Sequence, residues 1–391
     1  MPIRTPRNKT VHENGPTGIH SDMQNTSPMK TKSAAFSNRC VLRLIVMALL
    51  LTLLAGCGES SDTQSDDRNA NSSQSASAEK DKPLDKVTFT TSWYAQAEHG
   101  GYYQAVADGT YEKYGLDVTV DMGGPQVNNL QLLLAGKADF IMGYGVRALK
   151  SAGDGLPAVV VGAIFQKDPQ ALLAHPDIKT LADLKGHPIA VSSYADTTFW
   201  PWLQSKYGYT GDQKQPYSFS VAPFINNPEL AQQAYVTSEP FAVQQQADFE
   251  PTILLFADNG YPPYGNTITT TREMVEENPD VVQRFVTATI VGWQHYLDDP
   301  TEGNKHIQQA NADMSDEQIA FGIDKMKEYG LITGGDTGNP GIGTMTDERW
   351  KQTFDFMTNV GMVPADTDYK QVYTLDFVNK AQEMLGNDEP D

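Results

Sequence analysis

Four aromatic side chains stand near the ends of predicted strands, where they could stack on a planar ligand. Trp93 and Tyr94 directly follow residues 86–92, a β-branched, alternating segment that predicts a strand. Tyr144 lies between two glycines, which allow the backbone to approach a ligand closely. Tyr194 lies between a predicted strand and a predicted helix. Aromatic stacking adds roughly 1 kcal/mol beyond the burial of area. The pattern therefore favours a ring-shaped ligand, with simple packing of Trp93 and a tight turn at Tyr144 as the alternatives.

Three further side chains are candidates for polar contacts with that ligand. Glu239 follows an apolar strand, and its carboxylate could accept two hydrogen bonds from an amino-heterocycle, unless it is a surface acid. His99 stands at the start of the first predicted helix, where a lone histidine is more often structural than functional. Tyr264 either lines the mouth of a cleft or stiffens the chain there.

The same sequence offers little for catalysis or for metal binding. No histidines have the i, i+4 or HExxH spacing of a metal site. The only two cysteines are Cys40 and Cys57, so the chain beyond Cys57 has no thiol nucleophile, disulfide or thiolate ligand. We therefore expect no catalytic residue, no metal and no cofactor.

Cys57 ends a segment that is typical of a bacterial lipoprotein signal. Arg39 and Arg43 precede an apolar run of 12 residues, 44–55, which is shorter than the roughly 20 residues of a transmembrane helix. Leu54-Ala55-Gly56-Cys57 resembles the lipobox, which implies cleavage before Cys57 and acylation of its thiol. We expect residues 1–57 to be a signal peptide with an extended N-terminus; an ordinary signal peptide with a chance cysteine is the alternative.

Charge and composition separate a tether from a folded body. Residues 58–85 are rich in Ser, Asp, Asn and Gln and have no aromatic residue, which predicts a disordered tether spanning roughly 30 Å. The whole chain carries −20; the leader has seven Lys or Arg and two Asp or Glu, so −25 remains after its removal. Such an acidic protein is a poor partner for nucleic acid.

The body, 86–391, has 306 residues, which suits two lobes. Strands and helices alternate through 86–165, which predicts a parallel, helix-covered sheet, with one long helix over 99–114. A second, smaller α/β unit follows, with a strand expected at 217–222, and the end of the chain is rich in helices.

Six segments of the body form a pattern through their order and spacing: Trp93 with 99–103 (HGGYY), 109–118 (GTYEKYGLDV), 134–140 (LAGKADF), 178–186 (IKTLADLKG), 235–241 (YVTSEPF) and 278–285 (NPDVVQRF). Through these segments the body resembles the SsuA/THI5-like (NMT1) solute-binding family over roughly 86–300. The family implies an α/β, type II periplasmic-binding-protein fold, with two lobes joined by two crossing segments near 170–176 and 261–270. Lobe 1 is then about 86–172 and 263–391, and lobe 2 about 173–262.

This resemblance implies a monomeric substrate-binding lipoprotein that delivers a small molecule to the permease of an ABC importer. It places the protein in the periplasm or on the outer face of the cell membrane, anchored through Cys57. It also places Glu239 where pyrimidine-binding relatives carry an acid in the cleft. The acid, the tyrosines and the single nearby cation, Arg147, favour a planar nitrogen heterocycle, best a thiamine pyrimidine precursor and otherwise a flavin-like molecule.

Three other functions stay open at this point. Family members also bind small anions such as taurine, other sulfonates or nitrate, and helix N-termini could hold an anion here. A receptor with the same fold could sense its ligand rather than import it. The superfamily also contains an enzyme that makes the thiamine pyrimidine. In an alignment without gaps through 138–157 its lysine falls on Gly143 and its histidine on Arg147, which argues against that chemistry.

Overall fold

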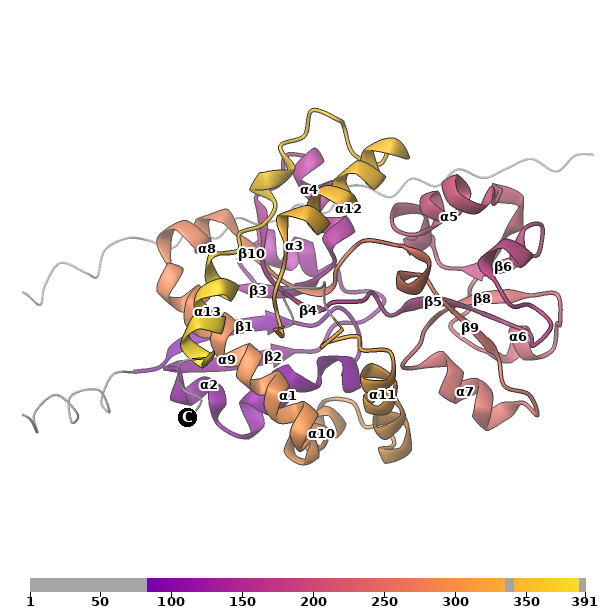
Figure 1. Cartoon of the computed structure of the whole chain (residues 1–391). Coiled ribbons are helices and arrows are strands. Elements are labelled where there is room, and N and C mark those ends of the chain that lie inside the picture. Colours follow the sequence, from indigo (N-terminus) through magenta and orange to yellow (C-terminus); the bar gives the residue numbers. More distant parts are fainter. Residues whose placement is uncertain (1–82, 335–340, 387–391) are drawn as a thin grey trace, which may run out of the picture. The chain divides into compact units, whose positions relative to one another are not determined.

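The computed structural model describes residues 83–334 and 341–386, which all belong to one compact unit (Figure 1). The predicted signal peptide, Cys57 and the predicted tether as far as residue 82 lie outside the described residues. None of the described helices is both long enough and apolar enough to cross a membrane.

The first of two five-stranded sheets has the strand order β2-β1-β3-β10-β4. Its strands are β1 (Asp85–Thr90), β2 (Leu116–Asp121), β3 (Phe140–Gly143), β4 (Ala158–Phe165) and β10 (Gly265–Thr271). β1 runs parallel to β2 and β3, but β10 lies antiparallel between β3 and β4. The four strands within 85–165 are therefore parallel to one another, as the sequence predicts, and β10 enters the sheet antiparallel between two of them. This strand returns from the second sheet instead of following a crossover helix, so the alternation of strands and helices does not set its direction.

The second sheet has the order β7-β6-β8-β5-β9. Its strands are β5 (Gln170–Ala174), β6 (Ile189–Val191), β7 (Lys214–Pro216), β8 (Ala231–Tyr235) and β9 (Thr252–Leu255). The chain passes from the first sheet to the second between β4 and β5 and returns between β9 and β10.

Two segments differ from what the sequence predicts. Residues 170–174, expected in a crossing segment between the lobes, form the strand β5. The strand expected at 217–222 is wrong: β7 ends at Pro216, and the alternating residues after it pair with no strand.

We call the first sheet with its helices lobe 1 and the second with its helices lobe 2. The helices of lobe 1 are α1 (Gly100–Ala107), α2 (Thr110–Lys113), α3 (Asn129–Leu134), α4 (Gly145–Gly153), α8 (Arg272–Glu277), α9 (Pro279–Asp298), α10 (Thr301–Ala310), α11 (Asp316–Glu328), α12 (Asp347–Asn359) and α13 (Asp376–Gly386). Those of lobe 2 are α5 (Trp200–Tyr207), α6 (Ala222–Ile225) and α7 (Glu239–Gln246). Short 3-10 turns complete both lobes: η1 (Ala97–His99), η2 (Leu181–Leu184), η3 (Ser193–Thr197), η4 (Gly211–Gln213), η5 (Ala257–Asn259) and η6 (Tyr369–Gln371).

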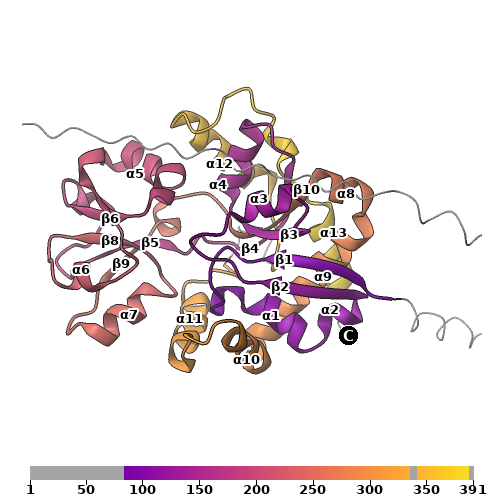
Figure 2. The ribbon, with the colours of Figure 1, turned by 180° about the vertical axis from the view of Figure 1, so that it is seen from behind.

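Helices cover both faces of the first sheet, with α3 and α4 on one side and α1 and α9 on the other, as Figures 1 and 2 show. The single helix expected at 99–114 is divided: η1 ends at His99, and Gly109, with a left-handed φ of 71°, separates α1 from α2. Helices α8 and α10 were not expected from the sequence.

Two glycines of the HGGYY segment allow α1 to pack tightly on α9. A Cβ at Gly100 would lie 2.0 Å from the ring of Tyr296, and one at Gly101 would lie 2.2 Å from the ring of Trp293. Phe285, also on α9, stacks on Phe140 of β3 at 4.2 Å between ring centroids. This close packing fixes α1, and with it the loop after β1 that carries Trp93.

Candidate functional site

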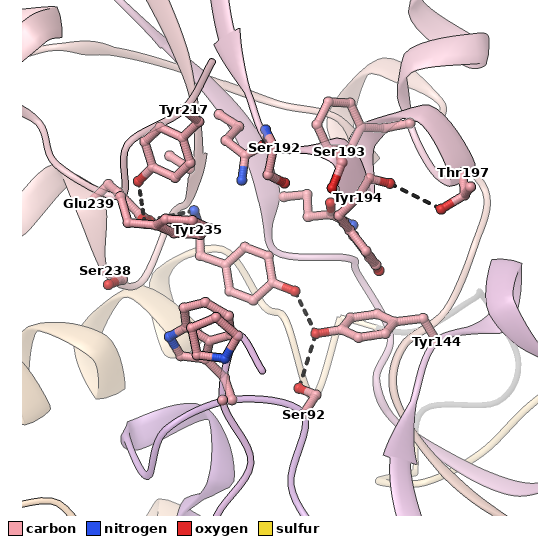
Figure 3. Close-up of a pocket in the computed structure, with 18 of the residues that line it drawn as sticks. Ser92, Tyr144, Ser192, Ser193, Tyr194, Thr197, Tyr217, Tyr235, Ser238 and Glu239 are labelled. Atoms are coloured by element: carbon pink, nitrogen blue, oxygen red, sulfur yellow. Dashed lines mark hydrogen bonds between the residues drawn. The ribbon is translucent and has the colours of Figure 1, made fainter. Parts of the chain in front are cut away.

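A cavity of about 490 Å³ lies where loops of the two lobes meet (Figure 3). Its aromatic lining includes Trp93 and Tyr144 from lobe 1 and Tyr194, Tyr217, Phe219 and Tyr235 from lobe 2. Trp93, Tyr144 and Tyr194 follow the carboxyl ends of β1, β3 and β6, the edge where open α/β sheets hold ligands. The volume is within the range of pockets that bind small molecules.

The structure brings four of the seven predicted ligand residues to this one cavity: Trp93, Tyr144, Tyr194 and Glu239. It also adds residues that the sequence did not point to, among them Tyr217, Phe219 and Tyr235. The first two lie in the segment expected as a strand. The alternation of aromatic residues and serines over 217–220 was the available signal, since it places both rings on one side of the chain.

A chain of hydroxyl groups joins the two lobes across the cavity. The hydroxyl of Tyr144 lies 2.6 Å from that of Tyr235 and 3.2 Å from Oγ of Ser92 (Figure 3). Burial raises the pKa of Tyr144, and it raises that of Tyr235 well above its usual range, so both phenols stay protonated. Each hydroxyl can therefore donate or accept a hydrogen bond.

Glu239, the first residue of α7, presents an oriented carboxylate to the cavity. Its Oε2 accepts the backbone N–H of Tyr235 at 2.8 Å, and its Oε1 accepts the hydroxyl of Tyr217 at 3.1 Å (Figure 3). These bonds fix the plane of the carboxylate and leave lone pairs on both oxygens for a ligand donor. Burial raises the pKa of Glu239, so it takes up a proton at a higher pH than an ordinary glutamate.

Trp93 and Phe219 form a second contact between the lobes. Their rings stack with centroids 5.7 Å apart and an interplanar angle of 29°. Phe219 is 57% exposed, and its φ of 57° is in the left-handed region, which is costly for a residue other than glycine. An exposed and strained aromatic residue at the edge of a cavity is typical of a functional position.

Arg147 is the only lysine or arginine in the lining of the cavity, all of which belongs to the described residues. Its guanidinium lies 4.5 Å from the centre of the Tyr194 ring, the geometry of a cation–π contact. The cavity therefore has little positive charge with which to hold an anion.

Three predicted ligand residues do not line the cavity. Tyr94 is 43% exposed and packs the edge of its ring against Trp93. His99 is buried, and burial lowers its pKa to about 3, so it is a neutral core residue. Tyr264 is buried beside the crossing: its hydroxyl accepts the N–H of Thr346 at 3.0 Å, and the Arg349 guanidinium lies 4.2 Å from its ring centre. Of the two roles expected for Tyr264, its position fits stiffening of the crossing.

A buried carboxyl group that does not line the cavity forms a third contact between the lobes. Glu98 of η1 in lobe 1 accepts the hydroxyl of Thr237, which precedes α7 in lobe 2. Burial raises the pKa of Glu98 from 4.5 to about 7, against the opposing effect of the Thr237 hydrogen bond.

The raised pKa of Glu98 predicts a pH-dependent stability. The folded state keeps this proton up to about pH 7, whereas the unfolded chain loses it near pH 4.5, so folding is disfavoured as the pH rises between these values. We expect Glu98→Gln to raise the free energy of unfolding at pH 8 by up to about 3 kcal/mol, and to change it little at pH 4. Urea titration at both pH values measures this, and an equal effect at both would contradict it.

No group of three or more His, Cys, Asp or Glu side chains within residues 83–334 and 341–386 could hold a metal ion.

Comparison with known proteins gives both a family and a fold. A model of the NMT1/THI5-like family matches residues 96–303. The periplasmic aliphatic sulphonate-binding protein SsuA of Escherichia coli superposes with a TM-score of 0.57 at 18% identity, over 73% of this chain and 91% of that one. The expectation of a type II periplasmic-binding-protein fold is therefore confirmed.

Two curated proteins are similar over most of the chain. The riboflavin-binding protein RibY of Chloroflexus aurantiacus is 24% identical over 360 residues, which are 86% of this chain and 98% of RibY. The formylaminopyrimidine-binding protein of Halalkalibacterium halodurans is 21% identical over 324 residues, which are 81% of this chain and 92% of that protein. Both names describe binding proteins.

Proposed function

Because the chain belongs to the NMT1/THI5-like family, we propose that it is the extracytoplasmic substrate-binding protein of an ABC importer and that it captures a small planar nitrogen heterocycle. The observation that supports this most is the cavity lined by Trp93, Tyr144 and Tyr235 around the oriented carboxylate of Glu239. Aromatic faces bind a flat ring, and the carboxylate accepts hydrogen bonds from its ring or amino N–H groups.

The candidate ligands are a formylated aminopyrimidine, our first choice, and a flavin-like molecule. The two similar curated proteins carry these two ligands in their names, and both ligands are flat nitrogen heterocycles with N–H donors. The carboxylate of Glu239 distinguishes an aminopyrimidine from ligands without such donors. Calorimetry with formylaminopyrimidine, riboflavin, taurine and nitrate tests the ligand class directly.

A small anion such as a sulfonate or nitrate is the second candidate, since SsuA of similar fold is named as a sulphonate-binding protein. The lining argues against it. Arg147 is the one lysine or arginine among the described residues that line the cavity, whereas the same lining holds the carboxylate of Glu239 and four tyrosines. Tight binding of taurine or nitrate in calorimetry, without binding of either heterocycle, would make a small anion the first candidate ligand.

Ligand capture by closure of the lobes follows from the contacts across the cavity. The Tyr144–Tyr235 hydrogen bond and the Trp93–Phe219 stack each join the two lobes. A ligand that contacts residues from both lobes binds the closed arrangement better than an open one, and so shifts the population toward closure. The closed form would then be the one that the permease receives.

Binding fits this chain better than catalysis. The sequence beyond Cys57 has no cysteine, and Gly143 and Arg147 stand where the related pyrimidine-forming enzyme has its lysine and histidine. The cavity supplies aromatic faces, hydroxyl groups and one carboxylate, a set suited to recognising a ligand. A receptor that senses its ligand would use the same site as a protein that delivers it for import. Genes for a permease and an ATPase beside the gene for this protein would favour import over sensing.

Acylation of Cys57 would anchor the protein to a membrane, with residues 58–85 as its tether. In a bacterial host with lipoprotein processing, we expect the wild-type protein in the membrane fraction. We expect Cys57→Ala to lose the lipid, which the mass of the mature N-terminal peptide would show, and to leave that fraction or stay unprocessed. Cys40→Ala is the matched control. Membrane association and mass unaffected by Cys57→Ala would contradict the anchor.

A further inference from the structure

A second cavity, of about 280 Å³, lies against one face of the second sheet. Its floor is a row across three strands: Ala190 of β6 is the cross-strand partner of Gln215 on β7 and of Gln232 on β8. Ser218, Ser220 and Asn227, from the segment that follows β7, also line it. The cavity thus lies between the sheet and the segment 218–227 and is open to solvent on the side of that segment.

The lining of this second cavity has a uniform chemistry. It consists of amide and hydroxyl side chains, prolines and small apolar residues, and it includes no charged residue. Such a set of neutral donors and acceptors suits hydroxyl groups and excludes an ion, which would be left unpaired.

Gln232 supplies an independent sign of an occupant. It is only 1% exposed, and its Nε2 has no hydrogen-bond partner in the part of the chain that the structure describes. A buried donor without a partner costs about 1–3 kcal/mol, so native proteins rarely keep one without a reason. Gln232 lines the cavity, and an oxygen of a bound molecule that reached its Nε2 would satisfy this donor.

The two cavities share a wall. Along the segment 217–220, Tyr217 and Phe219 line the first cavity while Ser218 and Ser220 line the second. Tyr217 lines both, and its hydroxyl donates to Glu239 in the first (Figure 3). A molecule in the second cavity would therefore touch the residue that holds the carboxylate of the first.

We propose that the second cavity binds a neutral, hydroxyl-rich group whose oxygen accepts a hydrogen bond from Nε2 of Gln232. The group is either the polyol chain of a ring ligand, reaching past Tyr217 from the first cavity, or a free polyol that acts on the first site through Tyr217. The first source rests on the flavin-like ligand of the proposed function, and the second rests on neither of its ligands.

Calorimetry with three probes separates these sources. Riboflavin carries a flavin ring and a ribityl chain, lumichrome has the ring alone, and ribitol resembles the chain alone. If the ribityl chain occupies the second cavity, riboflavin should bind the wild type roughly tenfold more tightly than lumichrome, because the ribityl chain adds about one hydrogen bond. Gln232→Leu then removes this advantage and leaves lumichrome binding unchanged. If a free polyol is the occupant, ribitol binds the wild type and fails to bind Gln232→Leu.

The exposed Gln244 on α7 lies outside both cavities, so Gln244→Leu is the matched control and should behave as the wild type. Gln232→Leu removes an unpaired donor, so its melting temperature should equal or exceed that of the wild type, which separates loss of binding from loss of folding.

The proposal would be overturned if the ratio of riboflavin to lumichrome affinity were the same in the wild type and in Gln232→Leu and if ribitol bound neither protein. The second cavity would then hold only water. If no ring ligand bound the wild type, the proposed function would be overturned instead. The ribitol measurement would still test whether the second cavity binds a polyol.

Discussion

Glu239→Gln should weaken the binding of an aminopyrimidine by roughly 10- to 100-fold, because a hydrogen bond to a charged acceptor contributes about 1.5–3 kcal/mol. The substitution keeps the shape of the side chain. Its amide oxygen can still accept the N–H of Tyr235, and the hydroxyl of Tyr217 can rotate to accept from the new amide. The loss therefore falls on the ligand and not on the fold, and calorimetry measures it.

The matched control is Glu250→Gln, the same change at an exposed position of lobe 2 that does not line the cavity. A sulfonate should be affected little by Glu239→Gln, or should bind better. Binding of the aminopyrimidine to the wild type should also fall at acid pH, starting above the usual range of glutamate, since burial raises the pKa of Glu239 and protonation removes its charge. Equal affinities in wild type and Glu239→Gln, or a wild-type affinity constant down to pH 4, would remove Glu239 from the site.

Trp93→Ala should weaken any planar ring ligand by roughly 10- to 100-fold, since loss of an aromatic ring beneath a flat heterocycle costs about 1–3 kcal/mol. Trp93 is half-buried, follows β1 and stacks on Phe219 of the other lobe, so its removal opens one wall of the cavity without emptying the core. Calorimetry, or quenching of tryptophan fluorescence where the tryptophan remains, measures the affinity.

Trp93→Phe is the control, because it keeps an aromatic face at the same place and should retain most of the affinity. Tyr94→Ala is a second control, since the exposed Tyr94 does not line the cavity. Unchanged ring binding in Trp93→Ala would show that the ligand binds elsewhere, and equal losses in Trp93→Phe and Trp93→Ala would exclude stacking as the cause.

The sequence was informative wherever a side chain follows directly from a strand. Trp93, Tyr144 and Tyr194 were predicted near the cleft because the carboxyl ends of strands meet at one edge of a sheet, and they do line one cavity. The sequence left the roles of Tyr264 and His99 open between ligand contact and structure, because burial decides between them and both side chains are buried. A tyrosine beside two prolines suits a cleft mouth or a packed crossing equally well, and only the contacts with Thr346 and Arg349 distinguish them.

The wall of the cavity could not be predicted because its conformation depends on contacts distant in sequence. Residues 217–220 alternate as a strand would, but β6, the neighbour of β7 in the sheet, ends at Val191, opposite Pro216. Phe219 instead adopts a left-handed backbone and stacks on Trp93. The direction of β10 escaped prediction for a similar reason, since it is set by the return of the chain from the other lobe.

The central claim is that the cavity between the lobes holds a planar nitrogen heterocycle, and native mass spectrometry tests it most directly. The protein would be stripped of any ligand by unfolding and refolding, then mixed with equal concentrations of formylaminopyrimidine, riboflavin, taurine and nitrate. We predict a single adduct with the mass of one of the two heterocycles, strongly reduced in Trp93→Ala. An adduct of taurine or nitrate alone, or a heterocycle adduct of the same intensity in Trp93→Ala, would contradict the claim.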